Sequence, residues 1–298
     1  VQTCALPIFI KPEYFGHVSI SSPSRSGTTH LTVETILQGE GWEKGWAQML
    51  QIAGNCAAVT DRSFAVPDGV NNGQYGVGIV IDFFGLAGKY SGFPVEFHYP
   101  NVTAVVPANI ALVAGGKNND EAKKFISFTL SREGQELLFD PKISRLPILP
   151  NASFGAKVPA GYPDAHEIAK RAKVQFDSHL SSDRYQVVVS LFDQMVTFRL
   201  KDLQAATKAI HDAERKLKAK PNAQAADLLK QARSYAYSPL VSDSMIKDAA
   251  FLELFRKNKK DVAVAKQLTG LEDLWSSKAK SNYDKARELA SQASALIK

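Results

Sequence analysis

The feature that most constrains this chain is a polar loop over residues 21–30, which stands between a strand pattern and a helix pattern. Residues 17–20 alternate like a short strand, and residues 31–37 place apolar side chains at helical spacing. The first turn of a helix carries backbone N–H groups without intrahelical partners at the positive end of the helix dipole. A strand–loop–helix junction of this kind readily receives an anion.

The loop supplies further donors. Ser26, Thr28 and Thr29 offer hydroxyl groups, and Gly27 would let the backbone approach a ligand closely. A plainer interpretation stays open, in which these hydroxyls only cap the helix. The loop is not a nucleotide P-loop, because no lysine follows the glycine at the required spacing.

Composition excludes several classes of protein. The 298 residues are 45% apolar and 22% charged, which is typical of a globular protein long enough for two domains. The longest apolar run, residues 77–88, is shorter than a membrane span and contains Asp82. The net charge of +6 is spread along the chain, and no nucleic-acid motif is present, so no nucleic acid partner is expected. The two cysteines, Cys4 and Cys56, support neither a disulfide framework nor a metal cluster, and no cofactor is expected.

Residues 1–8 resemble the translation of a short sequencing adaptor joined to a genuine reading frame. We therefore expect the natural protein to begin further upstream, the chain to be a fragment, and Cys4 not to be native. A missing signal peptide then carries no information about the compartment. Cys56 would be a single, buried thiol.

From residue 9 onward, strand and helix patterns alternate, which favours an α/β fold with ligands beyond the carboxyl ends of strands. Strands are predicted over residues 57–59, 75–81, 95–99 and 110–114. Helices are predicted over residues 31–52, with a break near Gly39 and Gly41, and over residues 66–72. Polar groups follow three of the strands: the loop of residues 24–29, the pair Arg62 and Ser63, and Asp82.

The second half is predicted to be helical. Val188, Leu191, Met195 and Phe198 recur at helical spacing and predict a core stripe.

A family resemblance rests on five motifs in succession: S-P-x-x-S-G-T at residues 22–28, an x-R-S-x turn at 61–64, G-x-x-G-x-G at 73–78, K-N-x-x-x-A-K-x-F at 117–125, and L-S-x-E-G-Q at 130–135. Together they resemble the extracellular solute-binding proteins of bacterial ABC importers, in the iron(III), phosphonate and sugar-phosphate group. The resemblance covers residues 9 to about 150. Residues 185–200 are similar to the phosphoglycerate-type binding proteins of the same superfamily.

The resemblance implies a type II periplasmic-binding-protein-like fold, in which two α/β lobes close over a ligand by a hinge. Only part of that fold is expected here. Residues 9–103 would form an α/β ligand-binding lobe, residues 104–180 would return to an incomplete first lobe, and residues 181–298 would form C-terminal helices. Residues 102–107 are a candidate hinge. The resemblance does not explain the helices after about residue 222.

The resemblance also bears on the ligand. Its iron(III) members use two adjacent tyrosines where this chain has Phe83 and Phe84, and a phenyl ring cannot coordinate iron. His30 and Glu34 stand four residues apart, but two ligands make a weak metal site. The phospho-ligand members use hydroxyls, helix N-terminal N–H groups and a carboxylate near the position of Asp82. The matching residues are Ser26, Gly27, Thr28, Thr29, Ser63 and Asp82, while Arg25 and Arg62 either add charge or face solvent.

The predicted function is that of the substrate-binding component of an ABC transporter, which captures a small anionic, phosphorylated organic solute for import. The implied partners are that solute and a membrane permease, and the implied location is the periplasm. An iron(III)-binding transporter component is one alternative, and an enzyme acting on a phosphorylated small molecule is another. The chain is not expected to be an enzyme, because no G-x-S-x-G or H-E-x-x-H motif occurs. Phosphoglycerate, a sugar phosphate, a phosphonate and inorganic phosphate all fit the predicted site.

Overall fold

The computed structural model describes residues 6–257 and 261–297. Residues 1–5, which include Cys4 and most of the expected adaptor segment, lie outside the described residues. The described chain divides into two units: a smaller one over residues 81–176, and a larger one made of residues 6–80 together with residues 177–297. The lobe boundaries expected after residues 103 and 180 stay predictions.

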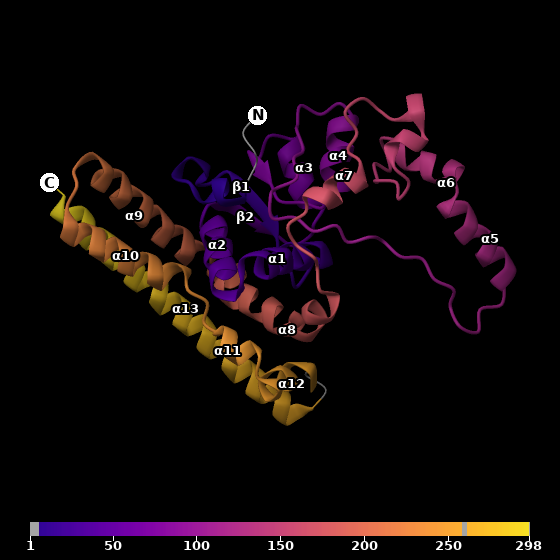
Figure 1. Ribbon diagram of the computed structural model, residues 1–298. Coiled ribbons are helices and arrows are strands. Elements are labelled where there is room, and N and C mark those ends of the chain that lie inside the picture. The colour runs from indigo at the N-terminus through magenta and orange to yellow at the C-terminus, as the bar shows by residue number, and fades with distance from the viewer. Residues whose placement is uncertain (1–5, 258–260, 298) are drawn as a thin grey trace. The chain divides into compact units, whose positions relative to one another are not determined.

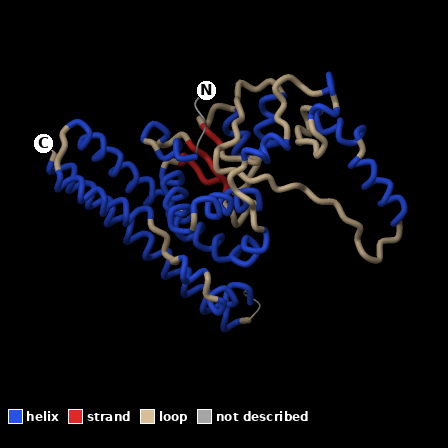
Figure 2. The backbone as a smooth tube through the Cα atoms, viewed as in Figure 1, coloured by secondary structure: helices blue, strands red, loops and turns tan. Residues whose placement is uncertain are grey.

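The larger unit contains a small parallel sheet, whose strands are red in Figure 2. Its strand order in the described residues is β2-β1-β3. Its strands are β1 (Val18–Ser21), β2 (Cys56–Thr60) and β3 (Val77–Gly78). The predicted strands at residues 17–20 and 57–59 are confirmed, whereas the apolar run at 75–81 forms a strand over two residues only. All four residues of β1 are buried, as expected for the central strand of a covered parallel sheet.

Two consecutive helices follow β1, namely α1 (Gly27–Glu40) and α2 (Trp42–Gly54). The predicted break lies at Gly41, whose φ of 84° is in the left-handed region that glycine tolerates. The helix α3 (Ala65–Asn71) follows β2 as predicted. Cys56 is buried, which confirms the expected buried thiol, and burial raises its pKa to about 12.

The C-terminal part of the larger unit is helical, as predicted. Its helices are α8 (Ser178–Met195), α9 (Leu200–Ala219), α10 (Ala223–Tyr237), α11 (Asp243–Ile246), α12 (Ala249–Lys257) and α13 (Val262–Leu296). The long helix α13 lies along α9 and α10 (Figure 1), and buried alanines on all three helices allow close approach. No helix within the described ranges is both long and apolar enough to cross a membrane.

Three of the four residues in the predicted core stripe, Val188, Leu191 and Met195, are buried on α8. Phe198 departs from the prediction, with 62% of its surface exposed. The reason is that α8 ends at Met195 and Phe198 lies in a 3₁₀ turn, where the helical spacing no longer applies.

The smaller unit is built from α4 (Asp82–Tyr90), α5 (Asn119–Leu130), α6 (Arg132–Glu136) and α7 (Ala165–Arg171). Its core is a hydrophobic cluster of Leu86, Phe139, Phe154 and Tyr162. Short 3₁₀ turns occur in both units: η1 (Leu6–Ile10), η2 (Pro12–Tyr14), η3 (Leu137–Phe139), η4 (Asn151–Ser153), η5 (Gly155–Lys157) and η6 (Thr197–Arg199).

The strands predicted at residues 95–99 and 110–114 are wrong for the structure described here, because both runs are loops. No backbone N–H from residue 96 to residue 115 donates a hydrogen bond to any residue that the structure describes, and the side chain of Val113 is 78% exposed. An extended segment becomes a strand only when a neighbouring strand supplies its hydrogen-bond partners. The local pattern of these runs is β-like, but the three-stranded sheet does not extend to them.

Candidate anion-binding site

The predicted anion-binding loop leads directly into the N-terminus of α1. Ser26 is the N-cap residue, and its Oγ accepts a hydrogen bond from the backbone N–H of Thr29 at 3.1 Å. The first intrahelical bond runs from the N–H of His30 to the carbonyl of Ser26 at 3.0 Å. In the described part of the chain, the N–H groups of Gly27 and Thr28 have no acceptor. The capping role is confirmed for Ser26, and two donors remain at the positive helix end.

Side chains of the first turn add to these donors. Thr28 is half-buried and Thr29 is buried, and neither hydroxyl has a partner among the residues that the structure describes. A Cβ placed on Gly27 would meet no atom within 4 Å, so there is open space beside the first turn. An anion could therefore reach both backbone and hydroxyl donors.

The second predicted loop emerges at the same edge of the sheet. Strands β1 and β2 are parallel, with Ser21 opposite Thr60, so the loops that follow them start side by side. The N–H of Ser22 donates to the carbonyl of Thr60 at 3.1 Å, and the hydroxyl of Thr60 donates to the carbonyl of Arg62 at 2.9 Å. Arg62 is exposed and Ser63 half-exposed. Six of the seven predicted residues lie in the loops after these two strands or in the first turn of α1: Ser26, Gly27, Thr28, Thr29, Arg62 and Ser63.

The seventh residue, Asp82, begins α4 in the smaller unit. Its Oδ1 accepts the N–H of Phe83 at 2.8 Å, and its Oδ2 accepts the hydroxyl of Tyr99 at 3.1 Å. Burial, reinforced by the Asp82 charge, raises the pKa of Tyr99, so the phenol keeps the proton it donates. The guanidinium carbon of Arg145 lies 3.2 Å from the ring centroid of Phe83. That Asp82 acts together with the loop residues of the larger unit stays a prediction.

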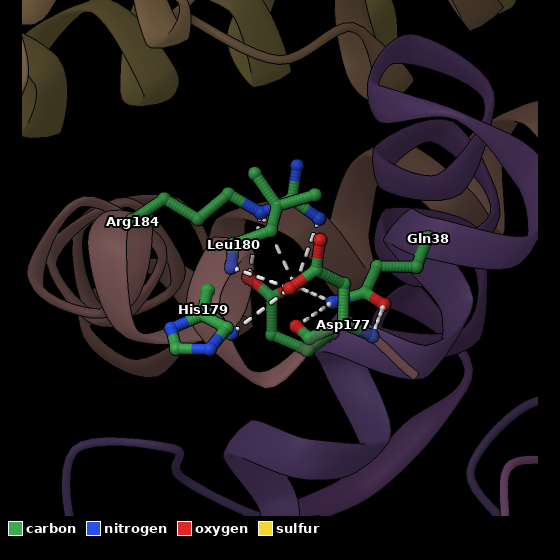
Figure 3. A network of polar contacts seen from close by, with 6 residues as sticks. Gln38, Asp177, His179, Leu180 and Arg184 are labelled. Carbon is green, nitrogen blue, oxygen red and sulfur yellow. Dashed lines mark hydrogen bonds and ion pairs between the residues drawn. The ribbon is translucent and has the colours of Figure 1, made fainter. Parts of the chain in front are cut away.

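The sequence did not reveal what supports α1. Helix α8 lies against it, and Arg184 on α8 donates to the carboxylate of Glu34 through Nε at 2.8 Å and Nη2 at 2.8 Å. The side chains of Glu34 and Arg184 are 0% and 5% exposed. At the end of α1, the amide of Gln38 pairs with the backbone of Asp177, whose carboxylate caps α8 (Figure 3).

His30 and Glu34, considered as a weak metal pair, have other partners. Glu34 is neutralised by Arg184, and the ring of His30 lies 4.1 Å from that of Tyr185. Burial lowers the pKa of His30, against the opposing influence of Glu34. Across the described residues, no group of three or more His, Cys, Asp or Glu side chains is arranged to hold a metal ion.

Comparisons with known proteins agree with this architecture. A family model for bacterial extracellular solute-binding proteins matches residues 6–165. The phosphoglycerate transport regulatory protein PgtC of Salmonella typhimurium is 36% identical over 208 residues, which are 70% of this chain and 50% of PgtC. An uncharacterized protein of Haemophilus influenzae is 28% identical over 129 residues, or 42% of this chain and 37% of that protein. The chain thus spans half or less of the length of these relatives.

Among solved structures, the periplasmic binding protein AfuA from Actinobacillus pleuropneumoniae, determined with exogenous fructose 6-phosphate bound, is similar in fold. Its TM-score is 0.51 at 22% sequence identity, and the match covers 65% of this chain and 60% of AfuA. The likeness supports a binding-protein fold for the matched part.

Proposed function

Because the chain belongs to the bacterial extracellular solute-binding proteins, we propose that it is the substrate-binding component of an ABC transporter and captures a small, phosphorylated organic anion. The observation that carries this proposal is the N-terminus of α1. Two N–H groups there lack acceptors among the described residues, and the hydroxyls of Thr28 and Thr29 lie on the same turn. These donors suit the oxygen atoms of a phosphate group.

Positive charge beside these donors supports an anionic ligand. The guanidinium groups of Arg25 and Arg62 are exposed and have no ion-pair partner within the described ranges. Each stands in a loop that follows a strand at the same sheet edge as the α1 N-terminus. Positively charged groups beside a binding site raise the local concentration of an anion and speed its association.

The names of two relatives indicate the class of ligand. PgtC is named for phosphoglycerate transport, and AfuA was determined with fructose 6-phosphate. We infer a phosphate monoester of a small hydroxylated carbon skeleton, delivered in the periplasm to a membrane permease. Binding would proceed without turnover and without a cofactor.

The test is calorimetric titration of the 298-residue chain with inorganic phosphate, phosphoglycerate and fructose 6-phosphate. A hydroxyl hydrogen bond to a charged group contributes about 1.5–3 kcal/mol, so Thr28→Ala should weaken binding of the bound phosphate compounds by about tenfold or more. Thr32→Ala is the matched control, because the Thr32 hydroxyl donates to the carbonyl of Thr28 at 3.1 Å inside the same helix. Equal affinities for wild type and Thr28→Ala, or no binding by wild type, would contradict the proposal.

Asp82→Asn tests the predicted carboxylate. A carboxylate near a phosphate repels it unless the carboxylate accepts a hydroxyl or amine of the same ligand. Asp82→Asn should therefore weaken an organic phosphate and spare inorganic phosphate. Equal effects on both ligands would remove Asp82 from the proposed site.

A further inference from the structure

We refer to residues 22–26 as the anion-binding loop. Ser22 connects this loop by hydrogen bonds to other parts of the larger unit. It is 2% exposed. Its N–H donates to the carbonyl of Thr60, and its carbonyl accepts the N–H of Arg25. Its hydroxyl lies 2.7 Å from the hydroxyl of Ser24 and 2.9 Å from Oδ1 of Asp193, on α8.

The donor and acceptor roles in this cluster follow from its chemistry. A carboxylate only accepts, so the single proton of the Ser22 hydroxyl points to Asp193. The Ser24 hydroxyl must then donate to Ser22, whose oxygen also accepts the N–H of Ser24 at 3.2 Å. Asp193 Oδ1 receives a second hydroxyl, that of Thr197, at 2.7 Å. The hydroxyl protons of Ser24, Ser22 and Thr197 are therefore all donated in the direction of Asp193.

We propose that Asp193 is a positioning residue for the anion-binding loop. This inference rests on the proposed function, since it concerns the same site. The hydrogen bonds that run from Ser24 through Ser22 terminate at the carboxylate of Asp193. Asp193 thereby fixes the conformation of residues 22–26 before a ligand arrives. A loop that is already ordered loses less conformational freedom when it binds, which raises affinity without any contact between Asp193 and the ligand.

The support for Asp193 comes from the C-terminal helices. The hydroxyl of Tyr283 on α13 donates to the carbonyl of Met195 at 2.7 Å, at the last residue of α8. The Glu34–Arg184 pair holds α8 to α1 at the other end. The Tyr283 contact gives α13, one of the helices that the family resemblance left unexplained, a role in holding α8.

The experiment compares wild type and four variants of the 298-residue chain by calorimetric titration with inorganic phosphate and by urea unfolding. Asp193→Ala should weaken phosphate binding at least tenfold. Asp193→Asn should stay within about threefold of wild type, because its amide oxygen accepts the same hydroxyls. Thr197→Val removes the other bond to Asp193, outside the loop, and should lower stability while leaving affinity unchanged. Ser22→Ala removes the hydrogen bond between the loop and Asp193 by changing the donor. It replaces Asp193→Ala in the comparison if Asp193→Ala does not fold.

The outcomes separate the two hypotheses. A wild-type chain that does not bind phosphate overturns the proposed function, and this inference with it. A wild-type chain that binds phosphate, with Asp193→Ala or Ser22→Ala binding equally well at reduced stability, overturns the positioning role alone. The same holds if Asp193→Asn loses as much affinity as Asp193→Ala, since the carboxylate charge rather than the hydrogen bond would then matter.

Discussion

The buried ion pair between α1 and α8 makes a sharp prediction about stability. Arg184→Met removes the guanidinium but keeps most of the apolar volume. It leaves the carboxylate of Glu34 fully buried, and among the described residues its remaining side-chain donor is the amide of Gln38, at 3.2 Å. One neutral donor does not compensate a buried charge.

Breaking a buried ion pair from one side typically costs about 3–5 kcal/mol, because the partner charge is left uncompensated. Since total stability is on the order of 5–15 kcal/mol, this loss should be large. The double variant Glu34→Leu with Arg184→Met removes both charges and should recover most of the loss, because apolar replacements of a buried pair are often neutral or stabilising.

The assay is urea unfolding followed by circular dichroism at neutral pH, for wild type, both single variants and the double variant. Arg256→Met is the control, because Arg256 pairs with the neighbouring Asp183 where the two side chains are 48% and 51% exposed. The loss of unfolding free energy in Arg256→Met should stay below about 1 kcal/mol. A loss for Arg184→Met as small as the control, or a double variant no more stable than Arg184→Met, would refute the reasoning.

Three further predictions concern pH, iron and association. Burial holds the pKa of His30 below its ordinary value of 6.5, so the unfolded chain binds a proton at this residue more readily than the folded chain does. The free energy of unfolding should therefore fall as pH drops below about 6.5. His30→Gln should flatten a plot of melting temperature against pH in that range. Ferric salts should produce no tyrosinate-to-iron absorption band, because phenylalanine stands at positions 83 and 84; a coloured complex abolished by a chelator would contradict this. Val105→Thr with Val113→Thr should reduce association in size-exclusion chromatography, because both valines are exposed; unchanged elution would show that this segment does not drive association.

Sequence reasoning succeeded where the structure depends on nearby residues. The β1–loop–α1 junction follows from a change of periodicity between residues 17–20 and 31–37 and from the capping chemistry of Ser26. The break at Gly41 follows from one glycine between two apolar helical patterns. These signals act over a few residues, so they can be read without knowing the fold.

It failed where structure depends on distant partners. The runs at 95–99 and 110–114 have β-like side chains, but a strand also needs a neighbour, which periodicity does not supply. Arg184 is 150 residues from Glu34, and Asp193 is 171 residues from Ser22. Nothing near either residue in the sequence signals its partner. The candidate donors were therefore predictable, whereas the residues that support them were not.

The larger unit is discontinuous in sequence, and this arrangement affects how the chain folds during synthesis. Helix α2 buries Trp42, Trp46 and Leu50, and it packs against α9 and α10. The indole N–H of Trp42 donates to the carbonyl of Val241, 199 residues later. A ribosome adding about 5–20 residues per second needs roughly 5–20 s to make the inserted unit of residues 81–176 alone. During that interval the tryptophan-bearing face of α2 lacks the contacts with α9 and α10 that help to bury it in the folded chain.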